Sequence, residues 1–136
     1  NIMADRDTTM MENLKVIVKA MEDKKAYNIE ILDIKDISPI ADYFVICSAS
    51  NLRQTRTIAD EVDEKMAEHN VKAVKVDDED LFGNPLREGY DTGKWILLDF
   101  NGIVVHIFSE DERDYYNLDK IWSDAKTLDL KALQEM

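Results

Sequence analysis

The stretch WILLDFNGIVVHIF, residues 95–108, constrains the fold of this chain more than any other segment. Apolar side chains alternate on either side of an Asn-Gly pair, and this arrangement is the strongest short signal for a β-hairpin. A two-residue loop also sets the register of the two strands, so the partners across the hairpin can be named. The predicted pairs are Phe100 with Ile103, Asp99 with Val104, Leu97 with His106, and Trp95 with Phe108.

The two faces of this hairpin differ in composition, because successive side chains of a strand point to opposite sides. One face is purely apolar and is expected in the core; it consists of Ile96, Leu98, Phe100, Ile103, Val105 and Ile107. The other face is also largely apolar, but it contains a carboxylate and an imidazole. Its members are Trp95, Leu97, Asp99, Val104, His106 and Phe108.

Three interpretations of the second face are open from the residues alone. Helices could cover it, in which case His106 is a core imidazole and Asp99 is its partner or a rim acid. Alternatively, His106 could act as a general base oriented by Asp99, but no nucleophile motif or glycine-rich phosphate loop accompanies the pair. Trp95 and Leu97 could instead form a docking surface for a protein partner. Because no nucleophile is evident, we assign no catalytic residue.

Hydrophobic periodicity predicts the remaining elements. Helices are expected over residues 9–25, 51–69 and 109–122, strands over 27–34, 43–47 and 71–76, and a last amphipathic segment over 127–136. Thr9 with Glu12, and Ser109 with Glu112, fit capping boxes at the starts of the first and third helices. The apolar stripe of the third helix is expected to comprise Tyr115, Leu118, Ile121 and Trp122, with Tyr116 pointing elsewhere.

This order of elements predicts an α/β (α+β) fold with a mixed β-sheet of about five strands flanked by helices. The chain length suits a single domain over residues 1–136. The continuous apolar run 43–47 is typical of a central strand covered on both faces. Asn51 is expected to cap the second helix and Asn70 to end it.

The chain has a net charge of −12, from 29 acidic and 17 basic residues. No Lys/Arg cluster is dense enough to grip phosphates, so direct sequence-specific binding of nucleic acid is not expected. The acidic excess suits either solubility or a basic protein partner. No segment approaches the roughly 20 apolar residues of a membrane span, and no signal peptide is visible. Because the lone Cys47 also fits a reducing cytosol, we expect a cytoplasmic protein without membrane contact.

Residues 77–94 are expected to form a long acidic loop. The acidic run at 77–80 could in principle hold a divalent cation, but nothing in it fixes the octahedral geometry that such a site requires. A charge run of this kind is usually solvated. We therefore expect no metal site and no cofactor.

Four blocks of the sequence carry a resemblance to a known family. They are DKKAYNIEILDI, ADYFVICSASN followed by a helix, EGYDTGKWILLDFNGIVVHIF, and ERDYYNLDKIW. In this order and spacing they resemble the ribosomal silencing factor family, also called the Iojap family. The resemblance covers about residues 10–125, and the additional C-terminal segment 127–136 lies outside it.

The resemblance implies a nucleotidyltransferase-like fold and a function that is not enzymatic. Members of the family bind ribosomal protein fourteen of the large ribosomal subunit, sterically block joining of the small subunit, and so repress translation. They are commonly homodimers. Trp95, Leu97 and Tyr116 match the family positions that are implied to contact the ribosomal protein. The further matching positions, which either contact it or shape the surface, are Asp99, His106 and Arg113.

The sequence departs from the family pattern in two places. Residues 100–103 lack an acid that often follows the turn, and the loop at 77–87 is longer and more acidic. Two other functions stay open: a metal-dependent nucleotidyltransferase-like enzyme, and a dimeric scaffold without ribosome contact. The enzyme would need carboxylates gathered around a metal ion, whereas Asp33 and Asp36 would point to opposite faces of a continued strand.

Overall fold

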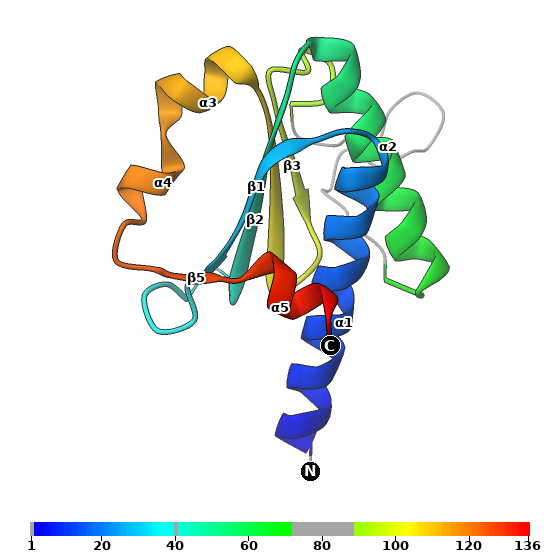
Figure 1. Ribbon diagram of the computed structural model, residues 1–136, viewed down its shortest axis with the longest axis vertical. Helices are drawn as coiled ribbons and strands as arrows, with labels where there is room; N and C mark the ends of the chain where they lie inside the picture. The colour runs from blue at the N-terminus through cyan, green and yellow to red at the C-terminus, as the bar shows by residue number, and fades with distance from the viewer. Residues whose placement is uncertain (1, 40, 72–88) are drawn as a thin grey trace.

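The computed structural model describes residues 2–39, 41–71 and 89–136, and these form a mixed β-sheet with helices on both faces (Figure 1). The strands are β1 (Tyr27–Asp33), β2 (Tyr43–Ala49), β3 (Trp95–Asp99), β4 (Ile103–Ser109) and β5 (Lys126–Leu128). The helices are α1 (Ile2–Asp23), α2 (Leu52–Glu68), α3 (Glu110–Tyr116), α4 (Leu118–Ile121) and α5 (Leu130–Gln134). The strand order is β3-β4-β2-β1-β5, in which β2 and β4 run parallel and the other neighbours antiparallel. Within the described residues, the predicted mixed five-stranded sheet flanked by helices is confirmed.

The hairpin of β3 and β4 has the register that its two-residue turn predicts, with Leu97 opposite His106. Both turn residues have positive φ, 59° and 109°, as a tight turn between twisted strands requires. The carbonyl oxygen of Gly102 accepts hydrogen bonds from the backbone amides of Asp42 and Tyr43, at 2.8 and 3.0 Å. These two bonds fasten the turn to the start of β2, so the hairpin joins the sheet in a defined position.

Strand β2 lies at the centre of the sheet, and every one of its residues is buried. Figure 1 shows α1 and α2 on one face of the sheet and α3 and α4 on the other. The face toward α1 and α2 is sealed by a large, mainly aliphatic cluster, which includes Leu14, Ile17, Met21, Ile58, Val62, Met66, Ile96 and Leu98. The prediction of a central strand covered on both faces is therefore confirmed.

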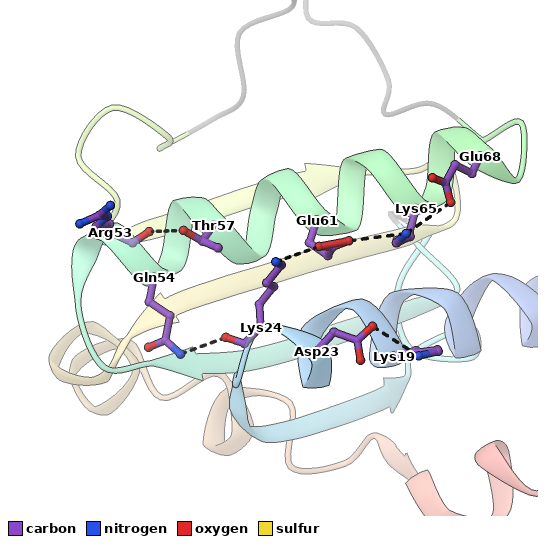
Figure 2. A network of polar contacts seen from close by, with 9 residues as sticks. All are labelled: Lys19, Asp23, Lys24, Arg53, Gln54, Thr57, Glu61, Lys65 and Glu68. Atoms are coloured by element: carbon purple, nitrogen blue, oxygen red, sulfur yellow. Dashed lines mark hydrogen bonds and ion pairs between the residues drawn. The ribbon is translucent and has the colours of Figure 1, made fainter.

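Polar contacts join α1 and α2 along their edges (Figure 2). Lys24, which follows α1, has its Nζ 3.4 Å from a carboxylate oxygen of Glu61, and its carbonyl oxygen accepts from Nε2 of Gln54 at 3.2 Å. Asn51 caps α2 as predicted, because its side-chain oxygen accepts from the backbone amide of Gln54 at 2.8 Å. Asn70, with φ at 63°, follows the end of α2 as predicted.

The first helix is longer than predicted, and both predicted capping boxes are wrong. Because α1 begins at Ile2, Thr9 lies inside the helix and not at its N-cap. Ser109 does occupy the N-cap of α3, but its side chain forms no capping hydrogen bond. Even the extended α1 does not change the membrane prediction: no helix in the described ranges is long and apolar enough to cross a bilayer.

The predicted third helix, residues 109–122, is two helices. Asn117 adopts a left-handed conformation, with φ at 44°, and this ends α3. Its side-chain oxygen then accepts from the backbone amide of Lys120 at 3.3 Å and starts α4. Asparagine tolerates this conformation better than most residues, and apolar periodicity does not reveal a single left-handed position.

The fifth strand of the described sheet is β5, which the sequence analysis did not predict. The expected strand at 71–76 and most of the expected acidic loop at 77–94 fall on residues 72–88, which lie outside the described residues. Instead β5, at the start of the last segment, pairs with the edge of β1, where Leu128 lies opposite Ile31. The sequence predicts only amphipathic character there. The helical part is limited to α5, whose Leu133 is buried in the cluster beneath α1.

Gly102→Ala is expected to lower the free energy of unfolding by about 1–2 kcal/mol, because residues other than glycine rarely adopt a φ of 109°. A Cβ at this position would also lie 2.5 Å from the side chain of Met10, which must move. Urea denaturation measures the change. The matched control is Asn101→Gly, at a φ of 59° that glycine adopts freely, and it should have much less effect. Equal losses in the two variants would contradict the role given to Gly102.

Candidate functional site

The candidate site is formed by Trp95 and Leu97 of β3 and Tyr116 of α3, which we call the aromatic surface. Trp95 and Leu97 are half-buried, and Tyr116 is 40% exposed. The rings of Trp95 and Tyr116 lie 4.7 Å apart between centroids. The structure therefore brings together side chains that the sequence analysis took from two separate blocks.

A second layer of rings lies beneath the aromatic surface. Phe108 is fully buried and stacks on Trp95, with 4.8 Å between centroids and 27° between planes. Phe44 of β2 meets the ring of His106 edge-on at 4.7 Å, and Trp122 meets Phe44 edge-on at 5.4 Å. The second hairpin face is thus divided: its β4 side is covered, and its β3 side is partly accessible. The covered interpretation holds for the β4 side, and the docking interpretation stays a prediction for the β3 side.

His106 is buried, with 5% of its surface exposed, and is hydrogen-bonded to Trp95. Nε1 of Trp95 donates to Nδ1 of His106 at 3.0 Å. Of the two alternatives for Asp99, the structure forms the rim acid and not the partner of His106, because the carboxylate is exposed and accepts from the backbone amide of Asn101 at 2.9 Å. Burial lowers the pKa of His106 to about 4, so the imidazole is neutral near pH 7. A buried imidazole with Nδ1 already occupied is poorly placed to serve as a general base.

The guanidinium of Arg113 anchors α3 to the sheet. The residue is buried, and its Nη1 donates to the carbonyl oxygen of Asn28 and to the hydroxyl of Ser48, the latter at 3.0 Å. Its Nη2 lies 3.4 Å from a carboxylate oxygen of Glu30. Asn28 lies where the pairing of β1 with β2 is interrupted, which makes its carbonyl available to the guanidinium. Arg113 therefore holds the helix that presents Tyr116.

The two neighbouring tyrosines of α3 do not point in the predicted directions. Tyr115 was expected on the packed stripe, but it is 80% exposed, whereas Tyr116 packs against Trp95. Leu118 and Trp122 do pack against the sheet as expected. The left-handed turn between α3 and α4 reorients the stripe, so one periodicity does not describe both helices. The ring of Tyr115 lies 5.1 Å from that of Tyr116 and extends the aromatic surface outward.

Exposed carboxylates occupy the same elements as the aromatic surface. They are Asp99 at the end of β3 and Glu110, Asp111 and Asp114 on α3. In the parts of the chain that the structure describes, no three His, Cys, Asp or Glu side chains gather so that they could hold a metal ion. The acidic run at 77–80 lies outside those parts. Asp99 lies on the same face of β3 as Leu97 and places negative charge beside the aromatic surface. Glu110 and Asp114 instead line a pocket with Tyr27 and Asn28 of β1.

The sequence analysis did not connect Phe44 and Trp122 with the site, although it expected Trp122 to pack on the sheet. Phe44 lies opposite Val104 in the parallel pairing of β2 with β4, and Ile46 lies opposite His106, so Phe44 and His106 share one face of the sheet. This relation could be inferred from side-chain alternation once β2 is known to adjoin β4. The sequence does not state which strands are neighbours, so no local signal identifies these residues.

Arg113→Met is expected to lower the free energy of unfolding by about 2 kcal/mol, because it removes the donor shared by the Asn28 carbonyl and the Ser48 hydroxyl. Methionine keeps most of the apolar stem, so the loss reports the polar contacts. Lys19→Met is the matched control: it removes an exposed ion pair with Asp23 and should change stability little. Chemical denaturation compares the two variants. A loss no larger than that of the control would show that Arg113 does not anchor α3.

Because the imidazole of His106 is buried, we expect the free energy of unfolding to fall in acid. Above pH 6.5 it is neutral in the folded and the unfolded chain, so it adds no pH dependence. As the pH falls from 6.5 toward 4, the unfolded chain takes up a proton that the folded chain does not. The lowered pKa therefore reduces the free energy of unfolding by up to about 3 kcal/mol. His106→Leu should remove this loss. Chemical denaturation at pH 6.5 and at pH 4 tests this prediction. If the free energies of unfolding of His106→Leu and the wild type differ by the same amount at both pH values, the prediction is contradicted.

The chain as a whole is similar to a known group of proteins. A family model described as ribosomal silencing factor during starvation matches residues 7–136, which includes the C-terminal segment. A ribosomal silencing factor of Bacillus subtilis is 39% identical over 117 residues, 86% of this chain and 90% of that protein. A ribosomal silencing factor of Halalkalibacterium halodurans is 38% identical over 122 residues, 90% of this chain and 95% of that protein. A crystal structure from Bacillus halodurans matches with a TM-score of 0.71 at 35% identity, covering 88% of this chain and 98% of that one.

Proposed function

The chain belongs to the ribosomal silencing factor family, and from this membership and the aromatic surface we propose how it acts. It binds ribosomal protein fourteen of the large ribosomal subunit through Trp95, Leu97 and Tyr116. The bound protein occupies space that the small subunit needs, so the subunits do not join and translation is repressed. It acts in the cytoplasm, as a homodimer.

The observation that carries this proposal is that the half-buried Trp95 and the exposed Tyr116 pack against each other at the protein surface. Tryptophan and tyrosine are enriched among the residues that dominate binding energy at protein interfaces. Here the β3–β4 hairpin and the buried ring of Phe108 hold the indole in place. A surface prepared in this way loses little side-chain entropy when a partner covers it.

The remaining residues that the family resemblance singled out take supporting roles. Asp99 is exposed and contributes negative charge beside the aromatic surface. His106 and Arg113 are buried, so they shape the surface from below instead of contacting the partner. With a net charge of −12, the chain would also attract a basic partner at long range, which favours rapid association.

This mechanism makes and breaks no covalent bond, so we propose that the protein is not an enzyme. The rival nucleotidyltransferase-like activity would rely on carboxylates such as Asp33. In the structure, that carboxylate lies 3.4 Å from Nζ of Lys35 and accepts from the backbone amide of the same residue. Nucleotide turnover that is lost in Asp33→Asn would overturn the proposal.

Trp95→Ala and Tyr116→Ala are each expected to weaken binding to purified large subunits by about 2 kcal/mol or more, roughly thirtyfold. Each variant removes a ring that a partner would desolvate. Cosedimentation measures the binding, and addition of small subunits then measures joining. The wild-type protein should block joining, and the two variants should not.

Ile37→Ala is the matched control for these two variants. Ile37 is also apolar and 47% exposed, but it lies in the turn between β1 and β2, at the opposite end of the sheet from Trp95. It should bind and block joining as the wild type does. Folded aromatic variants that bind normally would reject the aromatic surface, and a wild type that binds but permits joining would reject the steric mechanism.

A further inference from the structure

The hydrogen bond between Trp95 and His106 sets the chemical state of the imidazole. An indole N–H can only donate, so Nδ1 of His106 must accept, and the single ring proton of the neutral form is then on Nε2. The low pKa that burial gives His106 agrees with this neutral form. The indole side chain is thus tied to an acceptor that the solvent does not reach.

The other nitrogen of the same imidazole is costly to the fold. Nε2 of His106 is buried and has no hydrogen-bond partner among the described residues. Its ring is surrounded by apolar rings, with Phe44 edge-on at 4.7 Å and Phe108 at 6.2 Å. An apolar side chain of similar size would avoid an unpaired N–H at this position. The presence of an imidazole at this position is therefore explained by the hydrogen bond that Nδ1 accepts from Trp95, and not by the stability of the core.

We propose that His106 is a positioning residue, whose Nδ1 orients the indole of Trp95 for docking. Stacking on Phe108 fixes the plane of the indole, but stacking alone permits the ring to turn over. The hydrogen bond selects the orientation in which Nε1 points toward β4 and the ring lies beside Tyr116. The docking step rests on the proposed function, whereas the orientation of Trp95 is a property of the free protein.

Three replacements of His106 separate this role from simple packing. The side-chain oxygen of asparagine reaches about as far as Nδ1, so His106→Asn keeps an acceptor for the indole. The glutamine side chain is longer and places its oxygen nearer to Nε2, so His106→Gln should not restore the bond. His106→Leu removes the acceptor and also the unpaired N–H, so it should be at least as stable as the wild type.

The first measurement is the indole N–H resonance of the free protein by NMR. The chain has two tryptophans, so Trp122 is an internal control, and Trp95→Phe assigns the signals. In His106→Leu and His106→Gln, the Trp95 signal should shift upfield and exchange faster with water, while the Trp122 signal is unchanged. His106→Asn should keep the wild-type behaviour. An unmoved Trp95 signal in His106→Leu would overturn the proposal.

The second measurement is binding to large subunits in a double-mutant cycle. His106→Leu should weaken binding about tenfold when residue 95 is tryptophan and cause no further loss in a Trp95→Phe background, which has no indole N–H. Equal losses in both backgrounds would mean that His106 acts through packing and not through Trp95. Normal binding by His106→Leu would reject its role in docking. A wild type that does not bind would reject the proposed function, and the NMR result would still decide the orientation of Trp95.

Discussion

The structure depends on one tight turn, Asn101-Gly102. This turn closes the β3–β4 hairpin in register, and its Gly102 carbonyl accepts the first two amides at the start of β2. Because side chains alternate along a strand, a register shift of one residue would exchange the two faces of the hairpin. Trp95 would then face the aliphatic cluster, and Ile96 would take its place on the aromatic side. The same backbone geometry therefore decides the composition of the core and the position of the candidate site.

The parts of the fold that could be predicted from the sequence are those determined by near neighbours in the chain. The hairpin register follows from the length of its loop, and the start of α2 follows from the hydrogen bond that Asn51 makes to Gln54, three residues on. The burial of β2 follows from its continuous apolar run. In each case the residues that form the structure lie within a few positions of one another in the chain, so the local sequence pattern is enough to predict it.

The parts that could not be predicted depend on which elements become neighbours. Phe44 supports His106 because β2 adjoins β4, and the guanidinium of Arg113 reaches Asn28 because β1 is interrupted there. The pairing of β5 with β1 is of the same kind. The break at Asn117 is local, but one left-handed residue leaves the apolar spacing on either side intact. Periodicity therefore does not reveal it, although it ends α3 and starts α4.

The exposure of the aromatic surface follows from unequal cover on the two faces of the sheet. Against one face, α1 and α2 are long enough to bury the inward side chains completely, as for Leu14 and Ile58. Against the other face, α3 has seven residues and α4 has four, and the turn between them directs Trp122 onto Phe44. This cover reaches Trp95 only through the ring of Tyr116, so the indole stays half-buried. An unbroken helix would bury this tryptophan as ordinary core, so the short helices are what leave a rigid, hydrogen-bonded indole available to a partner.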